Sequence, residues 1–178
     1  VCEEGSQYNR HDAGYSSLLY NKRIFIEFLR SFVPQNWVEK LDENSIIRVD
    51  KKYVLQDFAE KEADMVYECK IGDKQVIFYI LVELQSTVDF LMPYRLLLYM
   101  VEIWREFFKK TPKHIRERKD FRFPSIVPIV LYNGKYNWTA CKRFKGIVDE
   151  SSQFGKYIPD FEYFLIDVNR YDEKDLLE

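Results

Sequence analysis

An acidic residue and an amide, two positions apart, follow the most apolar stretch of the sequence. Residues 76–82 are seven consecutive apolar residues, many of them β-branched or aromatic, and Glu83, Leu84 and Gln85 come directly after them. The run predicts a strand buried on both faces, and alternation along a strand places Glu83 and Gln85 on one side. An ionised carboxylate there is costly to desolvate unless a cation meets it. The end of this strand is therefore a candidate cation site.

A second carboxylate comes from the preceding stretch, residues 63–71, which also predicts a strand. Gly-Asp at positions 72–73 predicts a hairpin turn between the two strands. A two-residue turn pairs Asp64 with Leu81, which sets Asp64 diagonal to Glu83 on the same face, with β-carbons about 7 Å apart. A three-residue turn would place Asp64 on the opposite face. The turn length therefore decides whether the two acids can meet.

Two carboxylates and the carbonyl of Leu84 would form an oxygen-rich but incomplete coordination shell. Mg²⁺ prefers such shells, because it keeps several waters and binds through one or two carboxylates plus substrate phosphates; we expect Mn²⁺ to substitute for it. The matching chemistry is metal-assisted hydrolysis of a phosphodiester. The alternative is that Asp64 and Glu83 only end their strands on a solvated rim, and spacing alone does not separate the two interpretations.

Asp64 followed by Glu83-Leu84-Gln85 resembles the D…ExK site of the PD-(D/E)xK nuclease superfamily, with Gln in place of Lys. The chain also resembles the recombination-promoting nuclease (Rpn) family, which carries a transposase label as well. The similar stretches, in the family's order, are residues 10–12, 63–67, 81–86, 92–99, 127–134 and 164–168. The resemblance implies an α/β fold with a restriction-endonuclease-like core, a mixed sheet flanked by helices. It also implies a Mg²⁺-dependent DNA endonuclease linked to recombination or mobile elements.

The resemblance extends to residues before the first predicted helix. It implies that Asp12 is an acid beside the metal, whereas the simpler interpretation makes Asp12 the N-cap of that helix. His11 is expected to contact phosphate or to support the site. Gln85 can only form hydrogen bonds where the superfamily's usual Lys supplies a cation, which predicts modest activity. The alternative function is a nuclease-fold module that binds DNA or protein without turnover, and an RNA substrate is a third candidate.

The hydrophobic periodicity predicts the elements that position these residues. They are a helix over residues 13–33, a short helix over 35–41, an extended segment over 46–58, a helix over 90–110, and strands over 124–131 and 163–168. Pro128 predicts an edge or bulged strand, since proline lacks the N–H that an inner strand uses.

The helix over 90–110 is apolar around most of its circumference, which predicts burial against the sheet or at a partner interface, with a homodimer as one interpretation. Arg95 and Tyr99 lie four residues apart and share one face. In the functional interpretation, that face points toward the active cleft, where Arg95 contacts a phosphate and Tyr99 orients this phosphate. The alternative is that Tyr99 belongs to the core and Arg95 pairs with a structural carboxylate.

Charge is unevenly distributed along the chain. The 178 residues carry a formal net charge of −2, so DNA binding must depend on local patches. Residues 105–122 hold eight Lys or Arg against three acidic residues, and they are the best candidate for a surface that contacts the DNA backbone. The alternative is an ordinary solvated charged surface.

The length predicts one domain, and the resemblance leads us to expect that the protein continues beyond residue 178. We expect no membrane span, because no apolar run approaches 18 residues, and no signal peptide, because its pattern does not open the sequence. Three scattered cysteines fit a reducing cytoplasm better than a disulfide scaffold.

Overall fold

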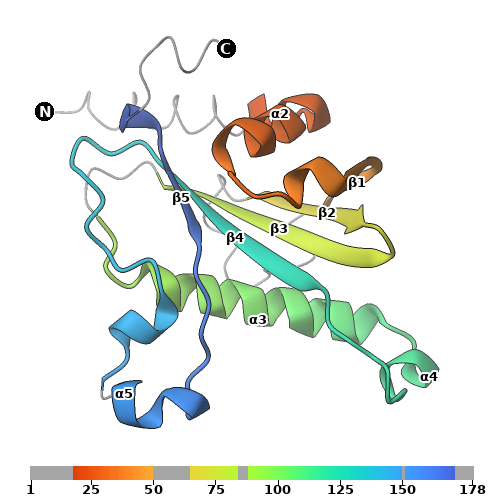
Figure 1. The fold of residues 1–178 in the computed structure, drawn as a ribbon. Helices are drawn as coiled ribbons and strands as arrows, with labels where there is room; N and C mark the ends of the chain where they lie inside the picture. Colours follow the sequence, from red (N-terminus) through yellow and green to blue (C-terminus); the bar gives the residue numbers. More distant parts are fainter. Residues whose placement is uncertain (1–17, 50–64, 84–87, 150, 171–178) are drawn as a thin grey trace, which may run out of the picture.

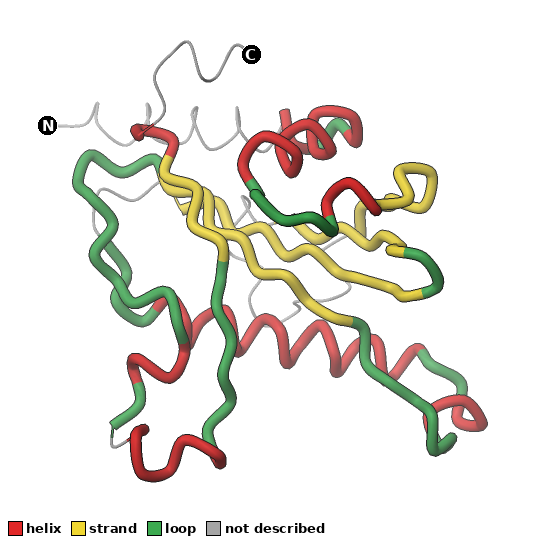
Figure 2. The backbone as a smooth tube through the Cα atoms, in the orientation of Figure 1, coloured by secondary structure: helices red, strands yellow, loops and turns green. Residues whose placement is uncertain are grey.

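One five-stranded sheet with helices on both faces forms the fold (Figures 1 and 2). The computed structural model describes residues 18–49, 65–83, 88–149 and 151–170. In spatial order the strands are β1 (Leu41–Val49), β2 (Met65–Ile71), β3 (Lys74–Glu83), β4 (Ser125–Tyr132) and β5 (Phe164–Asp167). Strands β1, β2 and β3 are antiparallel, whereas β3, β4 and β5 are parallel. This is the expected α/β fold with a mixed sheet, and it is consistent with a PD-(D/E)xK-like core.

The β2–β3 hairpin has the two-residue turn that the sequence predicts. Gly72 has a φ of 59°, a left-handed conformation that glycine adopts without steric cost and that such turns need. Pairing starts at Ile71 with Lys74 and continues without a bulge to Met65 with Ile80. The three-residue turn is thereby excluded. The next pair would begin at Asp64, which lies outside the described residues.

Strand β4 lies between β3 and β5, so the prediction that Pro128 marks an edge or bulged strand is wrong. Pro128 pairs with Tyr79 of β3 in an unbroken parallel register. Pairing of β4 with β5 begins one residue later, at Ile129 with Phe164. At the proline, β4 therefore has a neighbour on one side only, and a missing N–H can be accommodated there.

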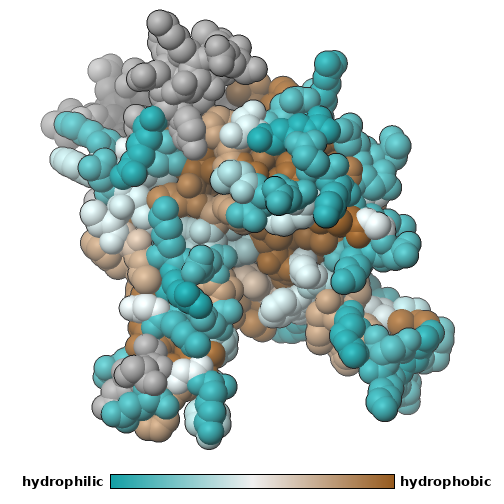
Figure 3. All heavy atoms as spheres, in the orientation of Figure 1, coloured by the Kyte–Doolittle hydropathy of each residue, from teal (hydrophilic) through white to brown (hydrophobic). Residues whose placement is uncertain are grey.

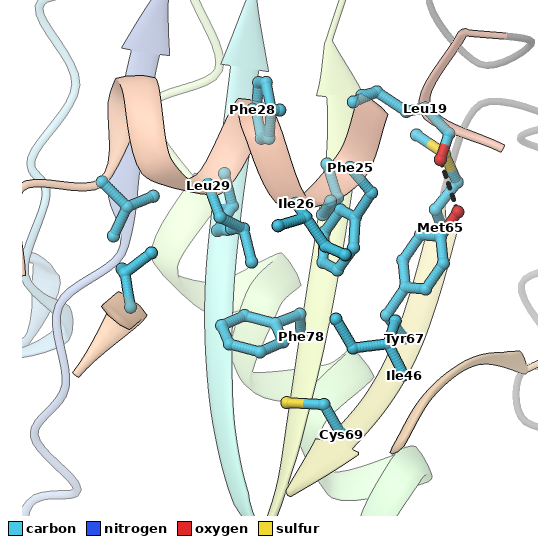
Figure 4. Packing of buried hydrophobic residues seen from close by; sticks show 14 of the residues in the cluster. Leu19, Phe25, Ile26, Phe28, Leu29, Ile46, Met65, Tyr67, Cys69 and Phe78 are labelled. Carbon is cyan, nitrogen blue, oxygen red and sulfur yellow. Dashed lines mark hydrogen bonds between the residues drawn. The ribbon is translucent and has the colours of Figure 1, made fainter. Parts of the chain in front are cut away.

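Helix α2 (Lys22–Phe32) covers one face of the sheet through Phe25, Ile26, Phe28 and Leu29 (Figure 4). Phe25 stacks on Tyr67 of β2 with ring centroids 4.0 Å apart, and the Tyr67 hydroxyl donates a hydrogen bond to the carbonyl of Leu19. Val33 ends the helix before Pro34, as predicted.

The predicted single helix over 13–33 is interrupted within its described part. Asn21 adopts an extended conformation and its side chain accepts a hydrogen bond from the Arg23 N–H at 2.9 Å, so Asn21 caps α2. An Asn side chain can compete for the backbone in this way, which is why it favours helix starts over helix interiors.

Helix α3 (Met92–Lys110) covers the opposite face, with Pro93 in its first turn, where proline is tolerated. Its inner side packs through Met92, Leu96, Tyr99, Met100 and Ile103. The outer side is exposed and mixed: Tyr94 and Val101 are 48% and 47% exposed, and Arg105 and Lys109 are exposed as well. Burial against the sheet, one of the two expectations, is thus confirmed for the inner side, and a partner interface on the outer side stays a prediction.

Shorter elements complete the described chain. They are η1 (Val38–Lys40), α4 (Lys113–Arg116), η4 (Phe144–Ile147), α5 (Ser151–Phe154), η5 (Gly155–Tyr157) and η6 (Val168–Arg170). The short helix predicted over 35–41 is reduced to η1, and β1 begins at Leu41 instead of residue 46. An irregularity between Asp42 and Ile47 hides the start of β1 from simple alternation.

Candidate functional site

The three parallel strands end together at one edge of the sheet. The backbone of Glu83 pairs with Tyr132, and Tyr132 pairs with Asp167, so the last residues of β3, β4 and β5 form a row that we call the carboxyl edge. Ligands of open α/β sheets bind outside the carboxyl ends of the strands. The structure thus brings the backbone of the predicted Glu83 into line with Asp167, to which the sequence analysis assigned no role.

Asp167 is a buried carboxylate that is only half satisfied. Asp167 is 7% exposed, and its Oδ2 forms an ion pair with Arg170 Nε at 3.1 Å. Oδ1 is buried and accepts no hydrogen bond from the described residues. A buried carboxylate oxygen without a donor is costly, and a cation or an external donor would remove that cost. Asp167 could have been identified from the sequence, because, like Glu83, it is an acidic residue at the end of an apolar strand.

Aromatic side chains support the carboxyl edge from the α3 side. Tyr132 is fully buried and meets Trp138 edge to face, with ring centroids 4.9 Å apart. Trp138 Nε1 donates to the Tyr163 hydroxyl at 3.0 Å, and this hydroxyl donates to the Cys141 carbonyl at 3.1 Å. Burial raises the pKa of Tyr163 to about 12, against the lowering effect of the Trp138 hydrogen bond, and the Asp89 charge adds to the rise. The hydroxyl therefore stays neutral and acts structurally.

Arg95 and Tyr99 occupy the first turns of α3. Arg95 Nη1 donates to Asp89 Oδ2 at 2.6 Å, and the two side chains are 21% and 24% exposed. Tyr99 is 5% exposed within the cluster between α3 and the sheet. These contacts are those of the structural alternative stated for both residues, while the Arg95–Asp89 pair remains partly open to solvent.

Several predicted site residues lie outside what the structure describes. They are His11, Asp12, Asp64, Leu84 and Gln85, together with the side chain of Glu83. Among the residues that are described, no three His, Cys, Asp or Glu side chains gather closely enough to hold a metal ion.

A hollow of about 330 Å³ lies at the other end of the sheet, between the last turns of α3 and strands β1 to β3. Its lining includes five polar side chains: Glu68, Gln75, Glu106, Lys110 and Thr111. Gln75 Nε2 donates to Glu68 Oε2 at 2.9 Å, so two of these groups satisfy each other. No sequence pattern indicated this hollow, and none of the predicted site residues lines it.

None of the described helices is both long enough and apolar enough to cross a membrane.

Comparison with known proteins identifies relatives of the chain. No solved structure matches it. Recombination-promoting nuclease RpnD of Escherichia coli O157:H7 is 24% identical over 134 residues, which are 74% of this chain and 49% of that protein. The chain thus spans about half the length of this curated relative. A family model described as "Putative transposase, YhgA-like" matches residues 9–178, which is nearly the whole sequence. The chain therefore belongs to this YhgA-like family.

Proposed function

We propose that this chain is a Mg²⁺-dependent endonuclease that hydrolyses phosphodiester bonds of DNA in recombination or in the movement of mobile elements. The relative named as a recombination-promoting nuclease supports this assignment. The structural observation that carries it is the carboxyl edge, where the backbone of Glu83 lies in line with the half-satisfied carboxylate of Asp167. The register of the β2–β3 hairpin, which reaches Met65 with Ile80, supports a place for Asp64 beside Glu83.

The donors proposed for the ion are all oxygens, which suits Mg²⁺. Asp64 and Glu83 would hold it with the Leu84 carbonyl, and Asp12 would add a further acid. Asp167 pairs with Arg170 through Oδ2, but its buried Oδ1 accepts no hydrogen bond from the described residues, and this open acceptor supports the proposal of a cation at this edge. When bound, Mg²⁺ stabilises developing negative charge and lowers the pKa of an attacking water.

Other residues would position the substrate. Gln85 would orient the water or a phosphate oxygen by hydrogen bonding, and His11 would contact phosphate. Arg95 is held at the start of α3 by Asp89, and we propose that a phosphate competes with this carboxylate for the partly exposed guanidinium. Tyr99 would act by packing, because it is almost fully buried.

The test is nicking of supercoiled plasmid in Mg²⁺ by the wild-type protein, Asp64→Asn and Glu83→Gln. Each isosteric variant removes one charge, and we expect nicking to fall by about 10²-fold or more, since a carboxylate ligand is lost. Glu39→Gln, an exposed change on η1 remote from the carboxyl edge, is the matched control and should nick normally.

Mn²⁺ affinity, measured by electron paramagnetic resonance, provides a readout that does not depend on turnover. It should fall in Asp64→Asn and Glu83→Gln but not in Glu39→Gln. Unchanged nicking by both site variants would refute the assignment and identify a contaminating nuclease. Metal binding and DNA binding without any nicking would favour the alternative, a nuclease-fold module that binds DNA without cleaving it. Preferential cleavage of labelled RNA would identify RNA as the substrate instead of DNA.

A further inference from the structure

A strongly basic segment projects from the end of the sheet opposite the carboxyl edge. We call residues 105–122 the basic projection: they comprise the last turns of α3, the short helix α4 and the segment that leads to β4 (Figure 1). Eight Lys or Arg against three acidic residues give the projection a formal charge of +5. Because the whole chain carries −2, the remaining residues carry −7. In Figure 3 the lobe around α4 presents a mainly hydrophilic surface with a small apolar patch.

The projection is held in place by its own aromatic cluster. Phe107 and Phe108 of α3 pack on Phe121 and Phe123, which follow α4, with ring centroids 6.2–6.3 Å apart. Phe121 and Phe123 meet edge to face at 5.2 Å. Arg116 lies over the Phe108 ring at 4.7 Å. A charged segment anchored in this way loses little conformational freedom when it binds a partner.

Part of the positive charge has no internal carboxylate partner. Arg118 forms two hydrogen bonds with Asp120, and Lys113 lies 3.7 Å from Glu117. Three further cations, at spacings of three residues, form no ion pair with the described residues: Arg116, Lys119 and Arg122. Arg122 instead donates to the carbonyls of Lys119 and Phe121. Lys119 and Arg122 are exposed and Arg116 is half-buried, and cations without a carboxylate partner suit a negatively charged ligand such as a phosphate backbone.

The distance to the carboxyl edge fits a length of duplex DNA. Strand β4 leaves the projection at Ser125 and reaches the carboxyl edge at Tyr132, which is about 23 Å at the usual rise of a strand. Helix α3 runs between the same two ends and is about 28 Å long. Since DNA rises 3.4 Å per base pair, the separation corresponds to about seven to eight base pairs.

We propose that the basic projection binds the backbone of duplex DNA about seven to eight base pairs from the phosphate that is cut at the carboxyl edge. This inference rests on the proposed nuclease function for the position of the cut. Contacts of Lys and Arg with phosphate do not depend on base sequence, so the projection supplies affinity and direction without specificity.

The test variant is Lys113→Gln/Lys119→Gln/Arg122→Gln, and the matched control is Lys22→Gln/Lys40→Gln/Lys70→Gln. Both remove three positive charges from exposed positions. Binding to a fluorescent duplex of about 24 base pairs is measured by anisotropy in EDTA, which prevents cleavage, over a series of salt concentrations. Each lost phosphate contact reduces the slope of log K against log salt by about 0.9. We expect the slope of the test variant to fall by about two to three, its affinity near 0.1 M salt to fall by about 10²-fold, and the control to match the wild type.

Duplex length supplies a second readout in Mg²⁺. The wild-type protein should cut the long duplex much better than one of about six base pairs, and the test variant should lose this preference. Circular dichroism establishes that the test variant is folded, and the double variant Lys113→Gln/Lys119→Gln replaces it if the Arg122 change disrupts the cluster. Equal salt slopes for test variant and control would overturn the inference whether or not the protein cuts DNA. A reduced slope without any Mg²⁺-dependent cutting would retain the DNA surface and reject the nuclease.

Discussion

The hydroxyl of Tyr163 is the group whose removal tests the support of the carboxyl edge most directly. It accepts a hydrogen bond from Trp138 Nε1 at 3.0 Å and donates one to the Cys141 carbonyl at 3.1 Å. Tyr163→Phe keeps the ring and removes both bonds. Trp138 is 7% exposed, so its N–H would be left buried without an acceptor, which costs about 1–3 kcal/mol. The Cys141 carbonyl belongs to a half-buried residue and can turn to water more cheaply.

We therefore expect Tyr163→Phe to lower the free energy of unfolding by about 2 kcal/mol. Urea denaturation should show a lower midpoint with an unchanged m-value, and the melting temperature should fall by about 4–8 °C for a chain of this size. A double-mutant cycle with Trp138→Phe isolates the pair, because removing the indole N–H also removes the unsatisfied donor. A loss below about 0.5 kcal/mol in Tyr163→Phe, or strict additivity in the cycle, would refute this account of the support.

Four further outcomes follow from individual residues. Burial raises the pKa of the Cys69 thiol from 9.0 to about 11, so the stabilisation from the neutral thiol is complete below pH 9 and is lost as the pH rises to 11. The free energy of unfolding from urea titrations should fall by about 2–3 kcal/mol over this range. Cys69→Val should abolish this pH dependence. Gly72→Ala should cost about 1 kcal/mol by thermal melting, because the left-handed φ of 59° is strained for alanine while no atom lies near enough to clash; an unchanged melting temperature would argue against this turn. Asp167→Asn should weaken Mn²⁺ binding several-fold by electron paramagnetic resonance if its charge acts at the carboxyl edge. Gln85→Lys should raise the nicking rate about tenfold by supplying a cation, and a rate at or below wild type would contradict the role given to Gln85.

The β2–β3 hairpin could be predicted from the sequence because its register depends on the residues of its own turn. Gly72 and Asp73 form the turn, and the turn fixes the pairing from Ile71 with Lys74 as far as Met65 with Ile80. Alternation along β3 then follows from the register alone. The partnership of Asp64 with Glu83 is the next step of the same inference and remains a prediction.

Long-range pairing explains what the sequence could not reveal. The tolerance of β4 for Pro128 depends on where β5 begins to pair, and β5 lies more than thirty residues further along the chain. The cap at Asn21 divides a stretch whose apolar spacing is compatible with one long helix. For Asp167, the row that joins it to Glu83 exists only because Tyr132 pairs with both strands. Periodicity predicts each strand but not its neighbours.

Helix α3 connects the two proposed DNA contacts. It starts at Met92, beside the Asp89–Arg95 pair, and ends at Lys110 within the basic projection. Six buried residues, from Met92 to Ile103, pack the helix against the sheet. The helix is therefore held as a rigid element, and the distance between its two ends is fixed. A duplex held at the projection would therefore lie at a set separation from the carboxyl edge. Charge removed from the projection should change how well DNA is held and which lengths are cut, whereas charge removed from Asp64 or Glu83 should change metal binding and cutting.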